Sequence, residues 1–296
     1  MSSAEEAGIL VQALPYIREH RGRTIVVKYG GASMINETLK AQVIQDIVLM
    51  NYVGIRVVLV HGGGPEIEAL LKRIGKESRF VQGLRYTDEE TMEVVQMVLC
   101  GKVNKDITAL IGKAGARAVG ICGIDGSTLK ARRIKAAGGE DLGLVGEIEE
   151  VDTTLVDTLL DRGIIPVLSS VAFGLGEDEG RPLNINADTA AAQVAAALKA
   201  EKLLLMTDVK GILRDVKDPA SLIPSATLAE LDLLKSEGVV SKGMIPKVEC
   251  CAIALKGGVK RAHIIDGREP HSLIVELFTD QGVGTMVSLT TGEKNG

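Results

Sequence analysis

The clearest indication of the architecture of this chain is the segment Thr24-Ile25-Val26-Val27-Lys28-Tyr29-Gly30-Gly31. Its β-branched run predicts a buried strand that ends at Lys28, and glycines follow. Such a strand end places a fixed cation beside uncovered backbone N–H groups, an arrangement that binds polyanions. A second apolar run, residues 56–61, continues into Gly62-Gly63-Gly64-Pro65. A tight turn into a helix would also explain these glycines, but the two segments together predict phosphate binding where the strands end.

Short apolar runs alternate with helical patterns along the rest of the chain. The predicted strands are 24–29, 56–61, 118–122, 164–169, 203–207 and 260–265, and the predicted helices are 37–51, 65–74, 88–112, 153–162, 187–199, 225–237 and 245–257. A hairpin is expected at 129–134 and 144–151, lying over the sheet. This alternation predicts a three-layer αβα sandwich with a central, mostly parallel open sheet. In such a sheet, ligands bind at the carboxyl ends of the strands.

The sequence also suggests a division into three parts. Residues 1–22 carry a helical apolar stripe, bent at Pro15, that suits self-association. Residues 23–180 would form a lobe for an amino-acid substrate, and residues 181–296 a nucleotide-binding lobe. The polar, glycine-rich segment 174–181 marks the boundary between these lobes.

Composition excludes several classes of function. The net charge of −5, the absence of Trp and the lack of a basic stripe argue against nucleic acid as a partner. No apolar run approaches the roughly 20 residues that span a bilayer, and the acidic N-terminus lacks a signal-peptide pattern. We therefore expect a cytoplasmic protein that does not contact membranes. The four cysteines show no C-x-x-C spacing, which favours reduced thiols over disulfides or a metal site.

A second lysine, Lys247, begins an apparent helix far along the chain from Lys28. Asn184, Asn186 and Asp188 stand at alternate positions, which on an extended strand would share one face. A helix cap is the alternative role for this motif, although capping needs only one such residue. A carboxylate on that face could orient both lysines without contacting the transferred group, and we interpret the chain as a small-molecule kinase. Neither a P-loop motif nor G-x-G-x-x-G after a strand is present.

Two further segments can bind polar ligands. Thr207-Asp208 ends a predicted strand and suits a ribose or phosphate contact, although ordinary turns use the same residues. Arg85 precedes a capped helix and could bind a carboxylate through two hydrogen bonds, with a plain surface position as the alternative. His61 is interpreted as a structural residue at a strand end rather than a base.

Taken together, six motifs resemble the amino acid kinase family from about Arg23 to the C-terminus. They are Lys28–Gly31, His61–Pro65, Gly83–Asp88, Asn184–Asp188, Thr207–Val209 and Gly243–Lys247. Within the family the chain is most similar to the members that phosphorylate N-acetyl-L-glutamate. The resemblance implies transfer of a phosphoryl group from ATP to the γ-carboxylate, as a step of arginine biosynthesis. It also implies a Mg²⁺ ion bound through the nucleotide phosphates and no metal site on the protein itself.

The same resemblance implies a role for each residue that matches a family motif. Lys28 and Lys247 would stabilise the transferring phosphoryl group, and Asp188 would position them. The acetylglutamate site would comprise Gly63, Gly64, Arg85 and Asn184. The nucleotide site would comprise Gly30, Gly31, Asp208, Val209, Lys210, Gly211, Ile212, Leu213, Lys242, Gly243 and Met244.

Family members that arginine inhibits resemble this chain at both ends. Arginine inhibition is therefore expected, with a site near Tyr16, Lys210, His263, Glu276, Gly282 and Gly284. In those members an N-terminal helix joins dimers into a hexamer, so a homo-oligomer is expected, as a dimer or as a trimer of dimers. The sequence does not decide whether a PII signalling protein binds.

Three alternatives remain open at this point. A different amino acid kinase would act on carbamate, aspartate or glutamate, although the setting of Arg85 favours acetylglutamate. A catalytically silent amino-acid sensor could share the fold, although Lys28, Lys247 and Asp188 are all present. A nicotinamide-dependent oxidoreductase is disfavoured by the missing dinucleotide motif.

Overall fold

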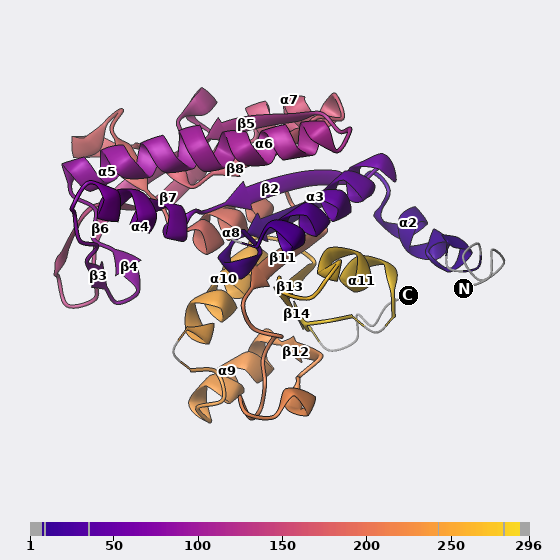
Figure 1. Cartoon of the computed structure of the whole chain (residues 1–296). Coiled ribbons are helices and arrows are strands. Elements are labelled where there is room, and N and C mark those ends of the chain that lie inside the picture. The colour runs from indigo at the N-terminus through magenta and orange to yellow at the C-terminus, as the bar shows by residue number, and fades with distance from the viewer. Residues whose placement is uncertain (1–7, 9, 35, 242, 281, 291–296) are drawn as a thin grey trace.

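The computed structural model describes residues 8, 10–34, 36–241, 243–280 and 282–290. Its centre is an eight-stranded sheet in the order β12-β14-β13-β11-β1-β2-β8-β5 (Figure 1). The strands are β12 (Ser225–Thr227), β14 (Thr285–Ser288), β13 (Arg261–Asp266), β11 (Lys202–Thr207), β1 (Thr24–Tyr29), β2 (Arg56–His61), β8 (Ile165–Ser169) and β5 (Ala118–Cys122). Neighbouring strands are parallel except β13 and β14, so the prediction of a mostly parallel sheet is confirmed.

Helices cover both faces of this sheet, which confirms the predicted layers (Figure 1). One layer contains α3 (Glu37–Tyr52), α6 (Asn104–Lys113) and α11 (Ser272–Phe278), and α3 contacts both of the others. The opposite layer contains α7 (Thr154–Asp161), α8 (Ala187–Ala197) and α10 (Met244–Lys256). This division follows from right-handed crossovers, because the chain moves from β1 towards β5 before it reverses through β8 to β11.

β1 forms at the centre because its side chains are apolar on both faces. Ile25, Val26 and Val27 are fully buried, and the strand pairs with β11 on one side and β2 on the other. The sheet and its core therefore run through both predicted lobes. The division into an amino-acid lobe and a nucleotide lobe stays a prediction.

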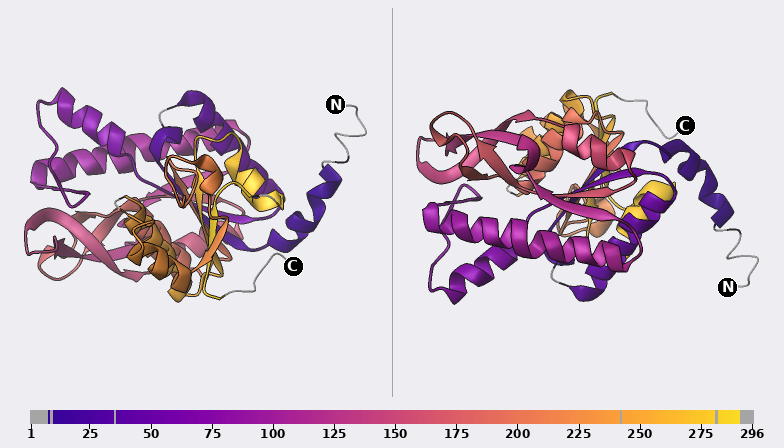
Figure 2. Two further views of the ribbon diagram at one scale, coloured as in Figure 1. Left: turned by 90° about the horizontal axis from the view of Figure 1, so that it is seen from below. Right: turned by 90° about the horizontal axis from the view of Figure 1, so that it is seen from above.

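The predicted hairpin is half of a small closed barrel. β6 (Leu129–Lys135) and β7 (Asp141–Val151) pair antiparallel, as expected, and β9 (Val171–Gly174) and β10 (Pro182–Asn184) complete the barrel. The last two strands flank the polar segment interpreted as a lobe boundary, which contains the 3₁₀ turn η4 (Gly176–Asp178). Both views in Figure 2 show the β6–β7 hairpin at the end of the molecule opposite the N-terminal helix.

Two predicted helices differ from the observed ones. The helix expected at 88–112 is α5 (Glu89–Gln96), a π-helical segment η2 (Met97–Val103) and α6, because apolar spacing does not reveal an inserted π turn. The helix expected from Ser225 begins later, as α9 (Leu228–Ser236). Thr227 is its N-cap in a capping box with Glu230, and the residues before it pair with β14.

The remaining elements are short or lie near the site. They are η1 (Gly31–Met34), α4 (Gly64–Arg73), β3 (Phe80–Val81), β4 (Leu84–Arg85), η3 (Asp125–Ser127) and η5 (Pro219–Ser221). At the N-terminus, residues 10–12 and α2 (Leu14–His20) are helical and a turn at Ala13 separates them, just before Pro15. Residues 1–7 and Ile9 of the predicted stripe lie outside the described residues. Within the described ranges, no helix is both long and apolar enough to span a membrane.

Candidate active site

Lys28, Lys247 and Asp188 meet at the carboxyl edge of the sheet. The Lys28 Nζ lies 2.9 Å from Asp188 Oδ1, and the Lys247 Nζ lies 3.2 Å from Asp188 Oδ2. The side chains are mostly buried, with 12% of Lys28, 19% of Lys247 and 14% of Asp188 exposed. Burial opposes ionisation of Asp188, but the two ammonium groups outweigh it and hold its pKa below the ordinary value. The cluster keeps a net positive charge, which suits a phosphoryl group.

Asp188 owes its position to the start of helix α8. Asn186 is the N-cap, and its side chain accepts hydrogen bonds from the backbone N–H groups of Asp188 (2.9 Å) and Thr189 (3.1 Å). The expectation that Asn184, Asn186 and Asp188 share one face of a strand was wrong. The strand ends at Asn184, and Asp188 is the second residue of a helix, because Asn186 supplies the cap that starts it.

A cavity of about 250 Å³ opens beside Lys28 and Asp188. It is lined by Lys28, Gly30, Gly31, Met34, Gly62, Gly63, Gly64, Pro65, Ile67, Phe80, Gly83, Leu84, Arg85, Leu99, Val145, Ser170, Asn184, Ile185, Asn186, Ala187 and Asp188. All four residues predicted for the acetylglutamate site are among them. The glycines of both strand-end loops also line it, so backbone reaches the ligand space from β1 and from β2. Such a wall can bind an anion at one end and a small polar molecule at the other.

Arg85 is held in place by its neighbours. Its Nη1 donates to Glu68 Oε2 at 2.9 Å and to the Ser78 hydroxyl, and its Nη2 donates to the Gly64 carbonyl at 3.3 Å. The guanidinium also lies over the ring of Phe80, 4.7 Å from its centroid. A cation fixed in this way at the cavity wall can bind a carboxylate with little loss of side-chain entropy.

His61 has a structural role, as the sequence suggested. Its Nδ1 lies 2.9 Å from the Gly62 carbonyl, and its Nε2 lies 3.0 Å from the Asn104 amide nitrogen. The amide donates, so Nε2 accepts and Nδ1 carries the proton. Burial lowers the pKa of His61 to about 4, which keeps the ring neutral. A neutral, fully bonded imidazole under the glycine loop supports the loop and leaves no free nitrogen for acid–base chemistry.

The residues predicted for the nucleotide site come from three segments, which follow β1, follow β11 and begin α10. Gly30 and Gly31 line the cavity, and Asp208 lies beside them, because a Cβ at Gly31 would be 2.4 Å from its Oδ1. Ile212 is buried, and its backbone N–H donates to Thr285 Oγ1 at 2.8 Å. The others lie after β11 (Val209, Lys210, Gly211, Leu213) or at the start of α10 (Gly243, Met244). Lys242 lies outside the described residues.

Comparison with known proteins places this arrangement in a family. A sequence profile described as the amino acid kinase family matches residues 23–266. The chain belongs to the amino acid kinase family. It is 56% identical to the acetylglutamate kinase of Heliobacterium modesticaldum, over 97% of this chain and 99% of that protein. It is 54% identical to the acetylglutamate kinase of Clostridium kluyveri, over 97% of this chain and the full length of that protein.

The fold has a counterpart among solved structures. N-acetylglutamate synthase from Neisseria gonorrhoeae, complexed with coenzyme A and N-acetyl-glutamate, superposes with a TM-score of 0.84 at 31% identity. The match covers 97% of this chain and 64% of that one. This member of the amino acid kinase family thus spans less than two thirds of the synthase chain.

Most of the residues of this chain that were predicted to bind arginine lie around helix α11. His263 Nδ1 lies 2.5 Å from Glu276 Oε1, the Val283 N–H donates to Glu276 Oε2 at 2.7 Å, and the Tyr16 hydroxyl donates to Asp280. Burial opposes ionisation of Glu276, but the bond to His263 holds its pKa below the ordinary value. Gly282 and Gly284 lie beside this cluster, on the segment leading into β14.

Lys210 does not belong to this cluster. It follows the carboxyl end of β11, where its charge acts on Asp266. The lysine whose charge acts on Glu276 and His263 is Lys202, at the opposite end of the same strand. Lys202 is buried, and burial lowers its pKa. Sequence analysis missed it because a lysine that begins an apolar strand resembles an ordinary solvent-facing strand end.

Some residues of the cavity wall were also missed by the sequence analysis. Val145 comes from the barrel, and no local pattern links that strand to the site. Ser170, directly after β8, could have been found, because it follows the carboxyl end of a predicted strand. All four cysteines are free thiols, and the described residues contain no group of three or more His, Cys, Asp or Glu side chains placed to hold a metal ion.

Proposed function

We propose that this chain transfers the γ-phosphoryl group of ATP to the γ-carboxylate of N-acetyl-L-glutamate. The products are N-acetyl-L-glutamyl 5-phosphate and ADP, and the reaction is a step of arginine biosynthesis. The proposal is carried by the convergence of Lys28 and Lys247 on Asp188 at the edge of a cavity walled by Arg85 and Asn184. The names of the relatives, acetylglutamate kinases at 53–56% identity, support the choice of substrate.

The chemistry needs positioning and positive charge rather than a base. The γ-carboxylate is already anionic at neutral pH, so one of its oxygens attacks the γ-phosphorus as the bond to the ADP oxygen breaks. The main obstacles are repulsion between the two anions and the charge on the equatorial phosphoryl oxygens. Lys28 and Lys247 oppose that charge, and Asp188 holds both ammonium groups before the substrates arrive, so little reorganisation is needed during the reaction.

The substrate would lie with its reacting end towards Lys28. Arg85 supplies a fixed guanidinium for a carboxylate, and Asn184 supplies an amide for the polar groups around the α-carbon. The backbone at Gly63 and Gly64 closes the same wall. Separating the anion-binding end from the recognition end in this way brings the γ-carboxylate alone to the phosphoryl group.

The nucleotide would approach from the side of β11 and α10. Gly30, Gly31 and the two lysines offer backbone N–H groups and cations to its phosphates, a donor set that fits a polyanion. Mg²⁺ would be bound through the β- and γ-phosphates, whose charge it neutralises. Asp188 is already paired with both lysines. We include a cytoplasmic location in the proposal, in keeping with ATP as substrate and with free cysteines.

A substrate panel tests this function. Purified protein with ATP and Mg²⁺ is given acetylglutamate, glutamate, aspartate or carbamate in turn, and acyl phosphate is trapped with hydroxylamine. We expect hydroxamate with acetylglutamate at least about 100-fold faster than with glutamate, because buried polar groups left unpaired strongly disfavour the wrong substrate. Equal rates with both would overturn the substrate assignment, and no product with any acceptor would favour the sensor alternative.

Inhibition by arginine is a further part of the proposal. A guanidinium ligand would find acidic partners in Glu276 and Asp280, and Asp280 accepts a hydrogen bond from Tyr16 on the N-terminal helix. That helix exposes Leu10, Val11 and Leu14 by 75%, 67% and 52%. An uncovered apolar face of this kind suits self-association. A homo-oligomer joined through the N-terminal helix would thus place the helix contact and the inhibitor site side by side.

A further inference from the structure

Thr87 connects two residues of the proposed acetylglutamate site through a single hydroxyl group. It is fully buried and lies between β4 and α5. Its Oγ1 donates to the Arg85 carbonyl at 2.8 Å and accepts from the Asn184 amide nitrogen at 3.1 Å. Asn184 lines the cavity, whereas Thr87 is enclosed behind it. The hydroxyl can therefore act on a ligand only through its neighbours.

The direction of the Asn184 amide follows from this geometry. A hydroxyl group has one proton, and that of Thr87 is used by the Arg85 carbonyl, so towards Asn184 it can only accept. The amide must therefore turn its NH₂ group to Thr87. A flipped amide would set its carbonyl oxygen against a hydroxyl oxygen that has no proton to give, so two acceptors would face each other without a hydrogen bond. Thr87 thus determines which edge of Asn184 faces the ligand.

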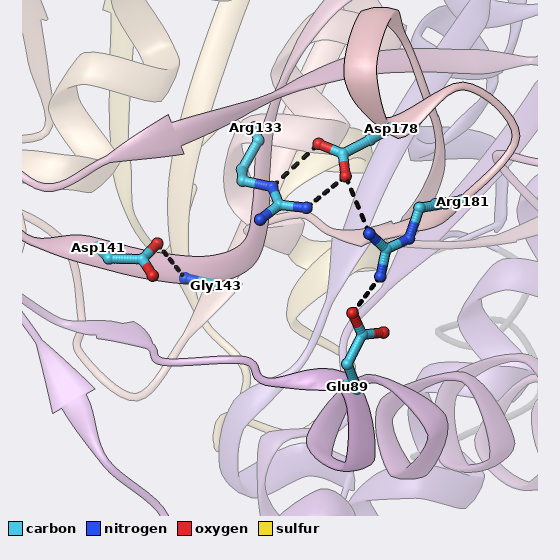
Figure 3. A network of polar contacts seen from close by, with 6 residues as sticks. All are labelled: Glu89, Arg133, Asp141, Gly143, Asp178 and Arg181. Atoms are coloured by element: carbon cyan, nitrogen blue, oxygen red, sulfur yellow. Dashed lines mark hydrogen bonds and ion pairs between the residues drawn. The ribbon is translucent and has the colours of Figure 1, made fainter.

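The backbone of Thr87 is clamped to the barrel. Its N–H donates to the Leu142 carbonyl at 3.0 Å, and its carbonyl accepts from the Leu144 N–H at 2.6 Å. Gly143 lies directly against this segment, and a Cβ there would be 2.2 Å from the Thr87 carbonyl oxygen. Its φ of +69° also favours glycine. Asp141 Oδ1 accepts from the Gly143 N–H at 2.9 Å (Figure 3).

A chain of ion pairs ties the barrel to the helix that follows Thr87. Figure 3 shows Arg133 and Arg181 on either side of the buried carboxylate of Asp178, with Arg181 reaching on to Glu89. The Arg133 Nε lies 2.9 Å from Asp178 Oδ2. Glu89 is the first residue of α5 and stands two positions after Thr87. The backbone clamp and the ion pairs thus fix Thr87 from both sides.

We propose that Thr87 is a positioning residue for recognition of the acetylated amino acid. Its hydroxyl orients the Asn184 amide and ties it to the backbone of Arg85, so that both groups meet the substrate in one fixed arrangement. This inference rests on the proposed function. It assigns the role to recognition and not to phosphoryl transfer, because Thr87 contacts neither Lys28 nor Asp188 among the contacts of the described residues.

Steady-state kinetics of Thr87→Val tests the inference, since valine keeps the shape and removes the hydroxyl. We expect KM for acetylglutamate to rise about 10-fold, while kcat and KM for ATP stay within about twofold of wild type. Thr87→Ser should restore KM, because it returns the hydroxyl. The matched control is Thr128→Val. Thr128 is equally buried and donates only to the Asp125 carbonyl at 2.7 Å, so KM should not change.

The outcomes separate this inference from the function on which it rests. An unchanged KM in folded Thr87→Val overturns the positioning role while leaving the kinase assignment in place. Equal losses of kcat/KM for acetylglutamate and for ATP would overturn it too, because they would indicate general damage. If the valine variant does not fold, Thr87→Ala is measured instead, with the same expected and contrary results. A wild-type protein that does not phosphorylate acetylglutamate overturns the proposed function, and the inference with it.

Discussion

The side chain of Lys28 folds back over the backbone of Gly30. A Cβ atom at residue 30 would lie 2.7 Å from the Lys28 Nζ, closer than such atoms approach in proteins. Gly30 thus leaves the space that the ammonium group needs to reach Asp188. The glycine after the strand therefore has a second role besides exposing backbone N–H groups, because it allows the lysine to adopt its working position.

Gly30→Ala should impair catalysis without destabilising the protein. The added methyl meets only the end of a flexible side chain, so Lys28 can move away at little cost in folding free energy. A catalytic group displaced by about 1 Å can lower kcat by roughly 100-fold. We expect that loss in kcat and a melting temperature close to wild type. Gly112→Ala, where nothing lies within 4 Å, is the control. Full activity of Gly30→Ala would show that the position of Lys28 is not critical.

Lys247→Ala should lower kcat by at least about 100-fold, by analogy with the loss of one preorganised donor to a transition-state charge. The fold should survive, which circular dichroism can check. Lys235→Ala is the control: Lys235 forms an exposed ion pair with Glu249 at 3.1 Å, the kind of surface pair that contributes little. Near-normal turnover of Lys247→Ala would exclude Lys247 from the mechanism.

The free energy of unfolding should decrease as the pH is lowered, and His61 should account for part of this loss. Its folded-state pKa of about 4 lies below the value of about 6.5 in an unfolded chain. The unfolded state therefore binds more protons between these values, and stability present above pH 6.5 is lost as the pH falls towards 4. The contribution is on the order of 3 kcal/mol. Denaturant unfolding at several pH values should show a shallower pH dependence for His61→Gln. An identical slope would mean that other groups cause the loss.

The apolar face of the N-terminal helix should control assembly. Replacing Leu10 and Val11 with serine should reduce the particle mass seen by light scattering, because these side chains are exposed and lack a cover within the described part of the chain. Leu233→Ser is the control, since Leu233 is an exposed leucine on a different helix, α9. The double variant should also lose any inhibition by arginine. An unchanged mass would place the oligomer contact elsewhere.

The sequence predicted the site well where local signals and sheet geometry were enough. Strand ends rich in glycine mark the carboxyl edge of a parallel sheet, which correctly placed Lys28 and the loop Gly62–Gly64 at one edge. Asp188 was predicted on an extended strand, whereas it lies in the first turn of α8, where the N-cap Asn186 sets its position. Thr87 stood within a recognised motif, yet its partner Asn184 is 97 positions away, and no periodicity reports such a contact. The same limit applies to Lys202, whose neighbours are set by the order of strands in the sheet.

The two lysines differ in how they are anchored, and this has a consequence for turnover. Lys28 belongs to a strand bonded on both sides, so it cannot leave Asp188 by backbone movement without breaking the middle of the sheet. Lys247 is carried by α10, on the outer layer, and reaches the same carboxylate from outside. Any change in the distance between the two lysines therefore requires movement of the outer helix, because Lys28 is fixed in the middle of the sheet.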